Sequence, residues 1–140
     1  MKENRKMIYL CLAHMSDECL EQKYIKEAFD TNWVVPLGPN VNGFEADLEG
    51  FVGEDKKVVA LRAGTAAVHL ALIACGVAPG DEVLVQSFTF CASSHPITYL
   101  GATPVFVDSE AETWNMDPEL LEEAIKDRIA KTGKKPKAIV

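Results

Sequence analysis

The chain has 140 residues, of which 48% are hydrophobic, and this is enough for one core or for part of a larger one. Fourteen basic residues against twenty-one acidic ones give a net charge of −7, and no stretch gathers Lys and Arg on one face, which argues against a nucleic-acid-binding surface. The four cysteines include no Cys-x-x-Cys pair, so we expect reduced thiols, three of them buried, in a cytoplasmic protein without a disulfide framework or a metal site.

The first residues do not match a leader peptide. Basic residues are followed by a short apolar run that His14 interrupts, and acidic residues come directly after it. No other stretch is long and apolar enough to cross a membrane. We therefore expect no membrane partner.

Two helices separated by a loop are predicted ahead of the core. Residues 16–30 place hydrophobic side chains at helical spacing, which predicts a surface helix with one buried stripe, and Ser16 stands where it can cap the first turn. Residues 31–42 are rich in Pro and Gly, which predicts a loop. Residues 43–53 resume the helical spacing and end in glycine, which predicts a second, short helix.

From residue 57 onward, predicted strands and helices alternate. Four unbroken apolar runs are typical of parallel strands covered on both faces: VVAL (58–61), EVLVQS (82–87), PVFVD (104–108) and KAIV (137–140). Three helices are predicted between them, over residues 65–75, 92–101 and 117–133. Pro96 falls in the first turn of the second helix, while Asp117 caps the third and Gly133 ends it. This alternation predicts an α/β fold.

The residues Gly-Thr-Ala at 64–66 join a predicted strand to the next helix. The first N–H groups of a helix have no partner inside it, and with the helix dipole they form a site for an anion such as phosphate. Gly64 lets a ligand approach the backbone, Thr65 adds a hydroxyl and Ala66 leaves its N–H uncrowded. The carboxyl end of a parallel strand is also where open α/β sheets bind ligands. The alternative is an ordinary helix N-cap with no ligand.

Two phenylalanines follow the strand predicted at residues 82–87. Of Phe88 and Phe90, one is expected to project beyond the carboxyl end of that strand toward the same crevice, where a flat ring can stack on an aromatic ligand. The alternative is that both rings belong to the core. His69 and His95 have no Cys, Asp or Glu at metal-ligand spacing, and we expect structural or hydrogen-bonding roles for them.

The chain contains four longer motifs in this order: GTAAVHLAL, GVAPGDEVLVQSFTFCAS, YLGATPVFVD and WNMDPELLEEAI. With them it resembles, from about residue 8 to residue 140, the amino-terminal part of the pyridoxal-phosphate-dependent nucleotide-sugar aminotransferases of the DegT/StrS type. Residues 14–45 are further similar to the branch that aminates 4-keto sugars carried on UDP, as in bacillosamine biosynthesis.

The resemblance implies a fold and a division of the chain. The fold is the amino-terminal portion of a fold-type I pyridoxal-phosphate-dependent transferase large domain, an α/β structure with a mixed, mostly parallel sheet and helices on both faces. Residues 1–53 are then the amino-terminal helices and a substrate-side loop. Residues 54–140 are part of the domain that binds the cofactor.

The resemblance also implies where the ligands bind. The phosphate of pyridoxal 5'-phosphate is expected on the turn formed by Gly64, Thr65 and Ala66, and the aromatic ring of Phe90 is expected to cover the pyridine ring. The nucleotide-sugar pocket, which commonly crosses a homodimer interface, is expected to be bordered by Asn32, Trp33, Val34 and Val35. Many relatives carry Ser before the Gly-Thr turn, whereas this chain has Ala63 there with Arg62 beside it.

Transamination needs a lysine that forms a Schiff base and an acidic residue that keeps the pyridine nitrogen protonated. In similar proteins both follow the strand that begins at residue 137, and so they are expected beyond Val140. The lysines near the end of this chain match no such motif and are expected on a solvated face: Lys126, Lys131, Lys134, Lys135 and Lys137. We therefore expect these 140 residues to be part of a longer gene product and to be inactive alone. In such a fragment the strand VVAL lacks the neighbouring strand that the family's sheet provides.

Three functions stay open at this point. The leading one is an aminotransferase that converts a nucleotide-linked keto-sugar into an amino-sugar, with glutamate as the amino donor. A sugar dehydratase of the same family carries histidine in place of the lysine and differs at a position beyond Val140. The third is a non-catalytic module that binds a phosphate ligand or a partner. A dinucleotide-binding domain is least favoured, because no Gly-x-Gly-x-x-Gly follows a predicted strand.

Overall fold

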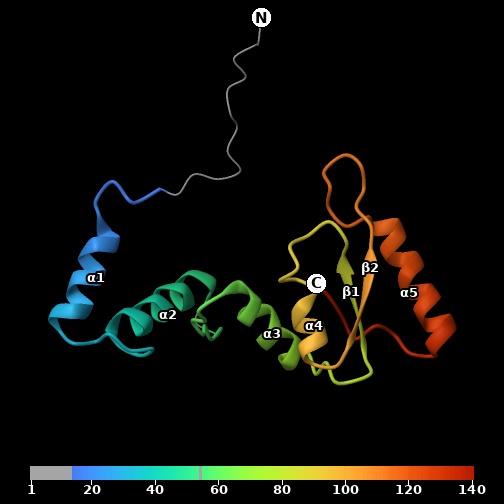
Figure 1. Cartoon of the computed structure of the whole chain (residues 1–140), viewed down its shortest axis with the longest axis horizontal. Helices are drawn as coiled ribbons and strands as arrows, with labels where there is room; N and C mark the ends of the chain where they lie inside the picture. Colours follow the sequence, from blue (N-terminus) through green and yellow to red (C-terminus); the bar gives the residue numbers. More distant parts are fainter. Residues whose placement is uncertain (1–13, 54) are drawn as a thin grey trace, which may run out of the picture. The chain divides into compact units, whose positions relative to one another are not determined.

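The computed structural model describes residues 14–53 and 55–140. By its internal contacts the chain divides into two compact units, the first ending at Ala60 and the second running from Leu61 to Val140 (Figure 1). The division at residue 53 that the sequence suggests stays a prediction.

The first unit contains helices α1 (Leu20–Asp30) and α2 (Pro39–Val52). Helix α1 begins later than predicted, with Cys19 rather than Ser16 as its N-cap residue. Ser16 still serves the first turn, because its Oγ accepts a hydrogen bond from the Leu20 N–H at 2.9 Å. The same hydroxyl donates to Glu21 at 2.7 Å, and the other carboxylate oxygen of Glu21 accepts the Ser16 N–H at 2.9 Å. The Ser16 hydroxyl thereby lowers the pKa of the Glu21 carboxyl. This reciprocal pair works in the manner of a capping box.

Helix α2 begins earlier than the sequence suggested. The loop predicted over residues 31–42 ends at Gly38, and Pro39 is the first helical residue. Proline is favoured at this position because the first N–H of a helix has no partner to lose. The predicted end at Gly53 is confirmed: this glycine has φ 116° and its N–H donates to the Glu49 carbonyl at 3.0 Å.

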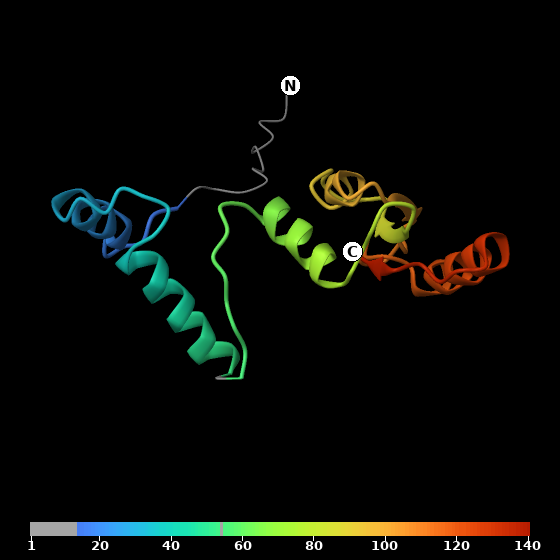
Figure 2. The same ribbon diagram turned by 90° about the horizontal axis from the view of Figure 1, so that it is seen from below.

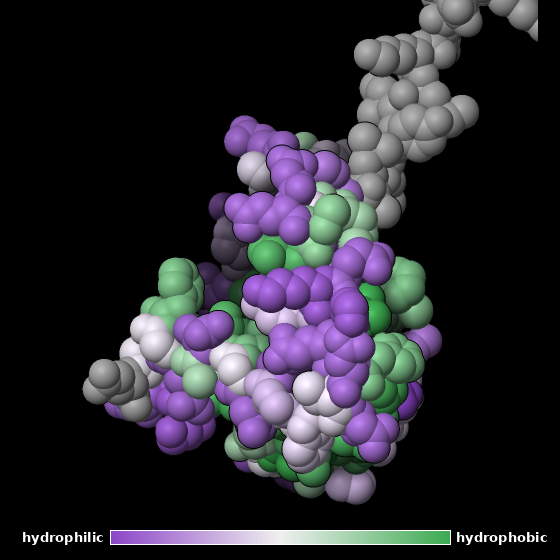
Figure 3. Space-filling view, turned by 90° about the vertical axis from the view of Figure 1, so that its left-hand side faces the viewer, coloured by the Kyte–Doolittle hydropathy of each residue, from purple (hydrophilic) through white to green (hydrophobic). Residues whose placement is uncertain are grey.

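The hydrophobic stripe predicted for the first helix is not buried within this unit. Neither α1 nor α2 has a buried residue, and the Phe29 and Phe44 side chains are 67% and 55% exposed. On the face drawn in Figure 3, hydrophobic residues lie on the surface beside hydrophilic ones. The first unit contains only these two helices in the described residues, and it has no further layer of structure there that could cover the hydrophobic stripe of α1.

The strand predicted over residues 58–61 is wrong, since these residues belong to no strand in the described part of the chain. A strand needs hydrogen bonds to a neighbouring strand. Here the Val58 N–H donates to Oε1 of Glu49 at 3.1 Å, and the Ala60 N–H donates to Oε1 of Glu45 at 2.8 Å. Two carboxylates one turn apart on α2 thus bind alternate N–H groups of an extended segment.

The sheet of the second unit has three parallel strands in the described residues: β1 (Glu82–Gln86), β2 (Thr103–Val107) and β3 (Ala138–Ile139). Strand β1 lies between the other two. The strands predicted from residues 82, 104 and 137 are therefore confirmed, as is their parallel direction. Residues 83–85 in β1 are all buried, which is typical of a parallel strand covered on both faces.

Helices cover both faces of this sheet. Helices α3 (Gly64–Ala74) and α4 (His95–Tyr99) lie on one side of β1, and α5 (Pro118–Thr132) lies on the other (Figures 1 and 2). The chain crosses from β1 to β2 in one direction and returns past β1 to β3 in the other. Right-handed crossovers therefore place α4 and α5 on opposite faces, as an α/β fold requires.

The local end signals of these helices are mostly confirmed. Asp117 caps α5 by accepting hydrogen bonds from the N–H groups of Glu119 and Leu120 at 2.8 and 3.1 Å, and Gly133 ends the helix with φ 72°. Helix α4 starts later than predicted, because residues 91–94 form turns before it. Pro96 still lies in the first turn of α4.

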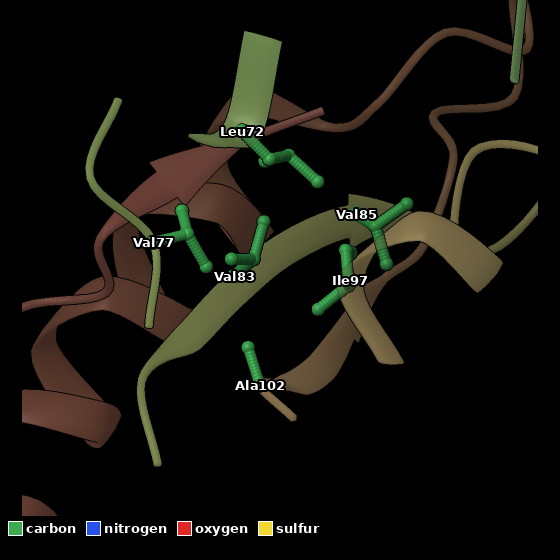
Figure 4. Packing of buried hydrophobic residues seen from close by; sticks show 6 residues of the cluster. All are labelled: Leu72, Val77, Val83, Val85, Ile97 and Ala102. Atoms are coloured by element: carbon green, nitrogen blue, oxygen red, sulfur yellow. The ribbon is translucent and has the colours of Figure 1, made fainter. Parts of the chain in front are cut away.

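The hydrophobic core lies between β1 and the two helices α3 and α4. Its buried side chains point toward one another in Figure 4: Leu72, Val77, Val83, Val85, Ile97 and Ala102. Val83, Val85 and Ile97 have no exposed surface. The opposite side of α3 is uncovered in this unit, since Leu70 and Ile73 are 45% and 50% exposed.

The cysteines are not buried, contrary to the expectation from their apolar neighbours. Cys19, Cys75 and Cys91 are free and exposed, because each lies in a cap or turn rather than on a packed face. Cys11 and the first apolar run lie outside the described residues. No helix of residues 14–53 and 55–140 is both long and apolar enough to cross a membrane.

Candidate functional site

The start of α3 presents two N–H groups without an acceptor in the described residues. Ala63 is the N-cap residue in an extended conformation, and its methyl side chain cannot accept a hydrogen bond. Its carbonyl oxygen accepts the N–H groups of Ala66 and Ala67 at 3.0 and 3.2 Å. Of the three predicted donors, Ala66 is thus used inside the helix, while the N–H groups of Gly64 and Thr65 stay free.

Gly64 has open space on the side where a side chain would stand. A Cβ atom built on Gly64 meets no other atom within 4 Å. The two free N–H groups, the Thr65 hydroxyl and the positive end of the helix dipole can therefore reach an anion without a change in the chain. Arg62, two residues ahead of Gly64, is exposed.

The turn lies toward the carboxyl ends of the parallel strands. The carboxyl end of α3 continues at Gly76 toward the start of β1, and both elements contribute to one core cluster. Helix α3 thus runs against the direction of β1, so its amino end lies toward the end of β1, as Figure 1 shows. The order β2-β1-β3 places the reversal of the crossovers at β1, where open α/β sheets bind ligands.

The two phenylalanines after β1 are surface residues. The side chains of Phe88 and Phe90 are 65% and 78% exposed, so the alternative that both belong to the core is wrong. Phe90 precedes a turn in which its carbonyl accepts the Ser93 N–H at 2.9 Å. Its ring is free to cover a flat ligand at the carboxyl end of the sheet.

A polar cluster lies at the same end of β1 and β2, and sequence reasoning missed it. The Ser87 hydroxyl donates to Oδ1 of Asp108 at 2.9 Å, and the Ser109 N–H donates to the same atom at 2.8 Å. These two donors, the Ser109 N–H first, lower the pKa of the Asp108 carboxyl. The signal available in the sequence was a polar residue directly after each of two neighbouring parallel strands.

Trp114 was also missed. Its ring lies 5.3 Å from that of Phe88, at an interplanar angle of 48°, and its side chain is 60% exposed. Nothing in the local sequence indicates this contact, because Trp114 and Phe88 are far apart along the chain.

The predicted substrate-side segment belongs to the first unit. Trp33 and Val35 line a cavity of about 100 Å³ between α1 and α2. Asn32 and Val34 are not among its lining residues. Asn32 has a left-handed backbone with φ 60°, and the Val34 side chain is 56% exposed. The Trp33 ring packs on Gly38, where an added Cβ would lie 3.1 Å from the ring. The structure therefore brings Trp33 and Val35 together at one cavity.

The remaining candidates have ordinary surroundings. The His69 ring makes an edge contact with Tyr99, with ring centroids 5.6 Å apart, and His95 lies beside the same tyrosine. Within the described residues, no three His, Cys, Asp or Glu side chains are grouped as metal ligands. Lys126 and Lys131 form exposed ion pairs with Glu122 and Asp127 on α5.

These residues fit a ligand with a phosphate group and a flat ring. The free N–H groups, the hydroxyl and the open space at Gly64 suit the phosphate, and the exposed ring of Phe90 suits the flat part. Pyridoxal 5'-phosphate has both parts.

The chain is similar to known sugar aminotransferases. It is 51% identical over 135 residues to EpsN of Bacillus subtilis, assigned as a pyridoxal phosphate-dependent aminotransferase, and covers 34% of that protein with 96% of this chain. It is 45% identical over 92 residues to the UDP-2-acetamido-2-deoxy-3-oxo-D-glucuronate aminotransferase of Pseudomonas aeruginosa, covering 66% of this chain and 25% of the relative.

The fold matches solved structures as well. The structure of Spr1654 from Streptococcus pneumoniae, assigned as a sugar aminotransferase and solved in its pyridoxal phosphate form, matches with a TM-score of 0.64 and 41% identity. That match covers 74% of this chain and 27% of Spr1654.

This chain spans about a third of the length of the curated relatives it matches. Over residues 16–140 it matches the sequence model of one family, described as the DegT/DnrJ/EryC1/StrS aminotransferase family. The fold, an α/β fragment like that of pyridoxal-phosphate-dependent aminotransferases, agrees with this match. The chain therefore belongs to the DegT/DnrJ/EryC1/StrS aminotransferase family.

Proposed function

We propose that this chain supplies part of the active site of an enzyme that transfers an amino group from glutamate to a nucleotide-linked keto-sugar. One observation carries the proposal: the N–H groups of Gly64 and Thr65 lack acceptors among the described residues, at a helix start where an added Cβ on Gly64 would meet no atom within 4 Å. Membership of a sugar aminotransferase family supports it.

Each residue of the proposed cofactor site has a separate role. The Gly64 and Thr65 N–H groups and the Thr65 hydroxyl bind the phosphate of pyridoxal 5'-phosphate, and Ala66 completes the first turn that holds these donors. The ring of Phe90 covers the pyridine ring. When bound, pyridoxal phosphate supplies an electron sink and carries the amino group.

The segment Asn32, Trp33, Val34 and Val35 is proposed to border the nucleotide-sugar pocket. The exposed indole of Trp33, at 49%, is a flat surface on which a nucleotide base can stack. The names of relatives that act on a UDP-linked 3-oxo sugar and make a GDP-linked amino-sugar support a nucleotide-linked substrate. A homodimer in the cytoplasm is part of the same proposal and rests on the family resemblance.

The experiment that tests this proposal uses the full-length protein and pyridoxal phosphate. We expect an absorbance band that borohydride abolishes. After the reduction, the protein mass should increase by the mass of the attached cofactor, because the Schiff base to lysine has become a stable bond. Supplying glutamate and a UDP-linked 4-keto sugar should then yield an amino-sugar, detected by mass spectrometry. The absence of a band would overturn the cofactor site and favour the non-catalytic module. Loss of water from the sugar, with no amino-sugar and no gain in protein mass after borohydride, would favour the dehydratase, which lacks the lysine.

A further inference from the structure

Residues 110–115 form a closed loop after β2, and this loop touches the segment after β1 through Trp114 and Phe88. The Glu110 N–H donates to the Asn115 carbonyl at 2.9 Å, and the Glu110 carboxylate accepts the N–H groups of Glu112 and Thr113 at 2.5 and 2.8 Å. The Asn115 amide donates to the Thr113 hydroxyl at 2.7 Å. The loop therefore holds its own shape through local hydrogen bonds.

Gln86 ties this loop to the end of β1. Its Nε2 donates to the Ser109 hydroxyl at 2.9 Å and to the Trp114 carbonyl at 2.6 Å. Side chains alternate along β1, so Gln86 points to the same face as Glu82, which binds Arg128 of α5. One side-chain amide thus fixes both ends of the loop to the strand that precedes Phe88.

Trp114 adopts a conformation that a bulky residue rarely takes. Its φ angle is 65°, in the left-handed region, and such a conformation persists only where the surroundings enforce it. Here the bond from Gln86 holds the carbonyl while the indole lies against Phe88.

Phe90 lies two residues after Phe88, the partner of Trp114 in this contact. Its side chain is 78% exposed and enters no ring contact among the described residues. The segment before it is fixed at Ser87, whose N–H donates to the Val107 carbonyl at 2.8 Å. Between Ser87 and the turn at Phe90, two side-chain contacts restrain the segment: the ring of Phe88 lies against Trp114, and the Thr89 and Ser93 hydroxyls share a hydrogen bond at 3.0 Å. Only the first of these links the segment to another element of the sheet's carboxyl end.

We propose that Trp114, held by Gln86, is a positioning residue that restrains the segment 88–90 so that the Phe90 ring can cover the pyridine ring of the cofactor. This inference rests on the proposed function. Trp114 makes no contact with the cofactor in this proposal, because its indole acts through Phe88. Removal of the indole should weaken binding of the pyridine ring and leave binding of the phosphate group unchanged.

The test measures binding of two probes, pyridoxamine 5'-phosphate and inorganic phosphate, to the full-length protein by titration calorimetry. Trp114→Ala should weaken pyridoxamine phosphate about fivefold to tenfold, the range expected from losing an aromatic contact. Inorganic phosphate should bind within about twofold of the wild type. The induced circular dichroism of bound pyridoxamine phosphate should fall, because its ring is held less firmly.

Three variants sharpen this test. Trp114→Phe keeps an aromatic ring against Phe88 and should restore both the affinity and the circular dichroism. Gln86→Leu removes the donor that holds the loop and should reproduce the loss seen for Trp114→Ala. Phe106→Ala removes another exposed aromatic ring from the same unit, one that enters no ring contact with Trp114 or Phe88, and should leave both probes unaffected.

The possible failures are distinguishable. If the wild type binds neither probe, the proposed function itself fails. If the wild type binds both and Trp114→Ala binds pyridoxamine phosphate equally well, only the positioning role fails. A parallel loss of phosphate binding in Trp114→Ala would also overturn that role, because it would show general damage to the fold.

Discussion

Arg128 of α5 and Glu82 at the start of β1 form two parallel hydrogen bonds. The Arg128 Nε donates to Oε2 of Glu82 at 2.9 Å, and the Nη2 donates to Oε1 at 2.8 Å. The side chains are only 24% and 19% exposed. Hydrogen bonding to Glu82 raises the pKa of the Arg128 guanidinium. This pair joins the helix on one face of the sheet to its central strand.

The first prediction concerns this pair. Arg128→Lys keeps the charge but replaces a planar two-donor group by a point charge, so it should lower the urea midpoint almost as much as Arg128→Ala. Lys126→Ala, which removes a 72%-exposed partner of Glu122, is the control and should change the midpoint little. A midpoint for Arg128→Lys equal to the wild type would show that charge alone matters.

The second prediction concerns pH. Hydrogen bonds from Ser109 and Ser87 hold the pKa of Asp108 below its ordinary value of 3.8. The ionised carboxylate therefore stabilises the folded state fully above about pH 5, and this stabilisation is lost as the pH falls through the ordinary value toward the lower folded-state pKa. Asp108→Asn should destabilise the protein at pH 7, and the difference from the wild type should shrink at pH 3. A difference that stays constant with pH would contradict this origin.

The third prediction concerns the cap of α5. Asp117→Ala leaves two N–H groups without their acceptor and should lower the free energy of unfolding by about 1 kcal/mol. Asp117→Asn keeps an oxygen acceptor and should cost only a few tenths of that. Chemical denaturation of both variants measures the difference. Equal destabilisation by the two would point to charge rather than capping.

The fourth prediction concerns the proposed phosphate site. Gly64→Val places a branched side chain in open space, so the fold should keep its thermal midpoint while both pyridoxamine phosphate and inorganic phosphate bind about tenfold more weakly. Gly50→Val adds the same side chain to open space on α2 and should leave both affinities unchanged. Loss of both probes at Gly64 would contrast with the selective loss expected at Trp114.

Much of the second unit could be predicted from the sequence because its signals are local. The alternation of apolar runs and helical spacing is enough to place β1, β2 and β3, and the Asp-Pro start and glycine end are enough to place α5. The start of α2 was missed because Pro39 was interpreted as a loop residue, whereas proline also suits the first position of a helix.

The rest depends on contacts that the sequence does not display. The contact between Trp114 and Phe88 relies on a bond from Gln86, 28 residues earlier in the chain. The extended segment at residues 58–61 has the composition of a strand, but a strand also needs a partner. The turn at Gly64 and Thr65 was predictable as a helix start, and its role as the cofactor's phosphate site remains a prediction that the binding experiments address.

The carboxylates of Glu45 and Glu49 have a consequence for how a larger sheet can grow. They occupy the N–H groups of Val58 and Ala60, which lie along a single edge of the extended segment because successive amides alternate sides. Another β-strand can therefore pair with this segment only along the opposite edge, where the Val59 N–H lies. As long as the two carboxylates hold these amides, a sheet that includes the segment carries it as an edge strand, with helix α2 covering the edge.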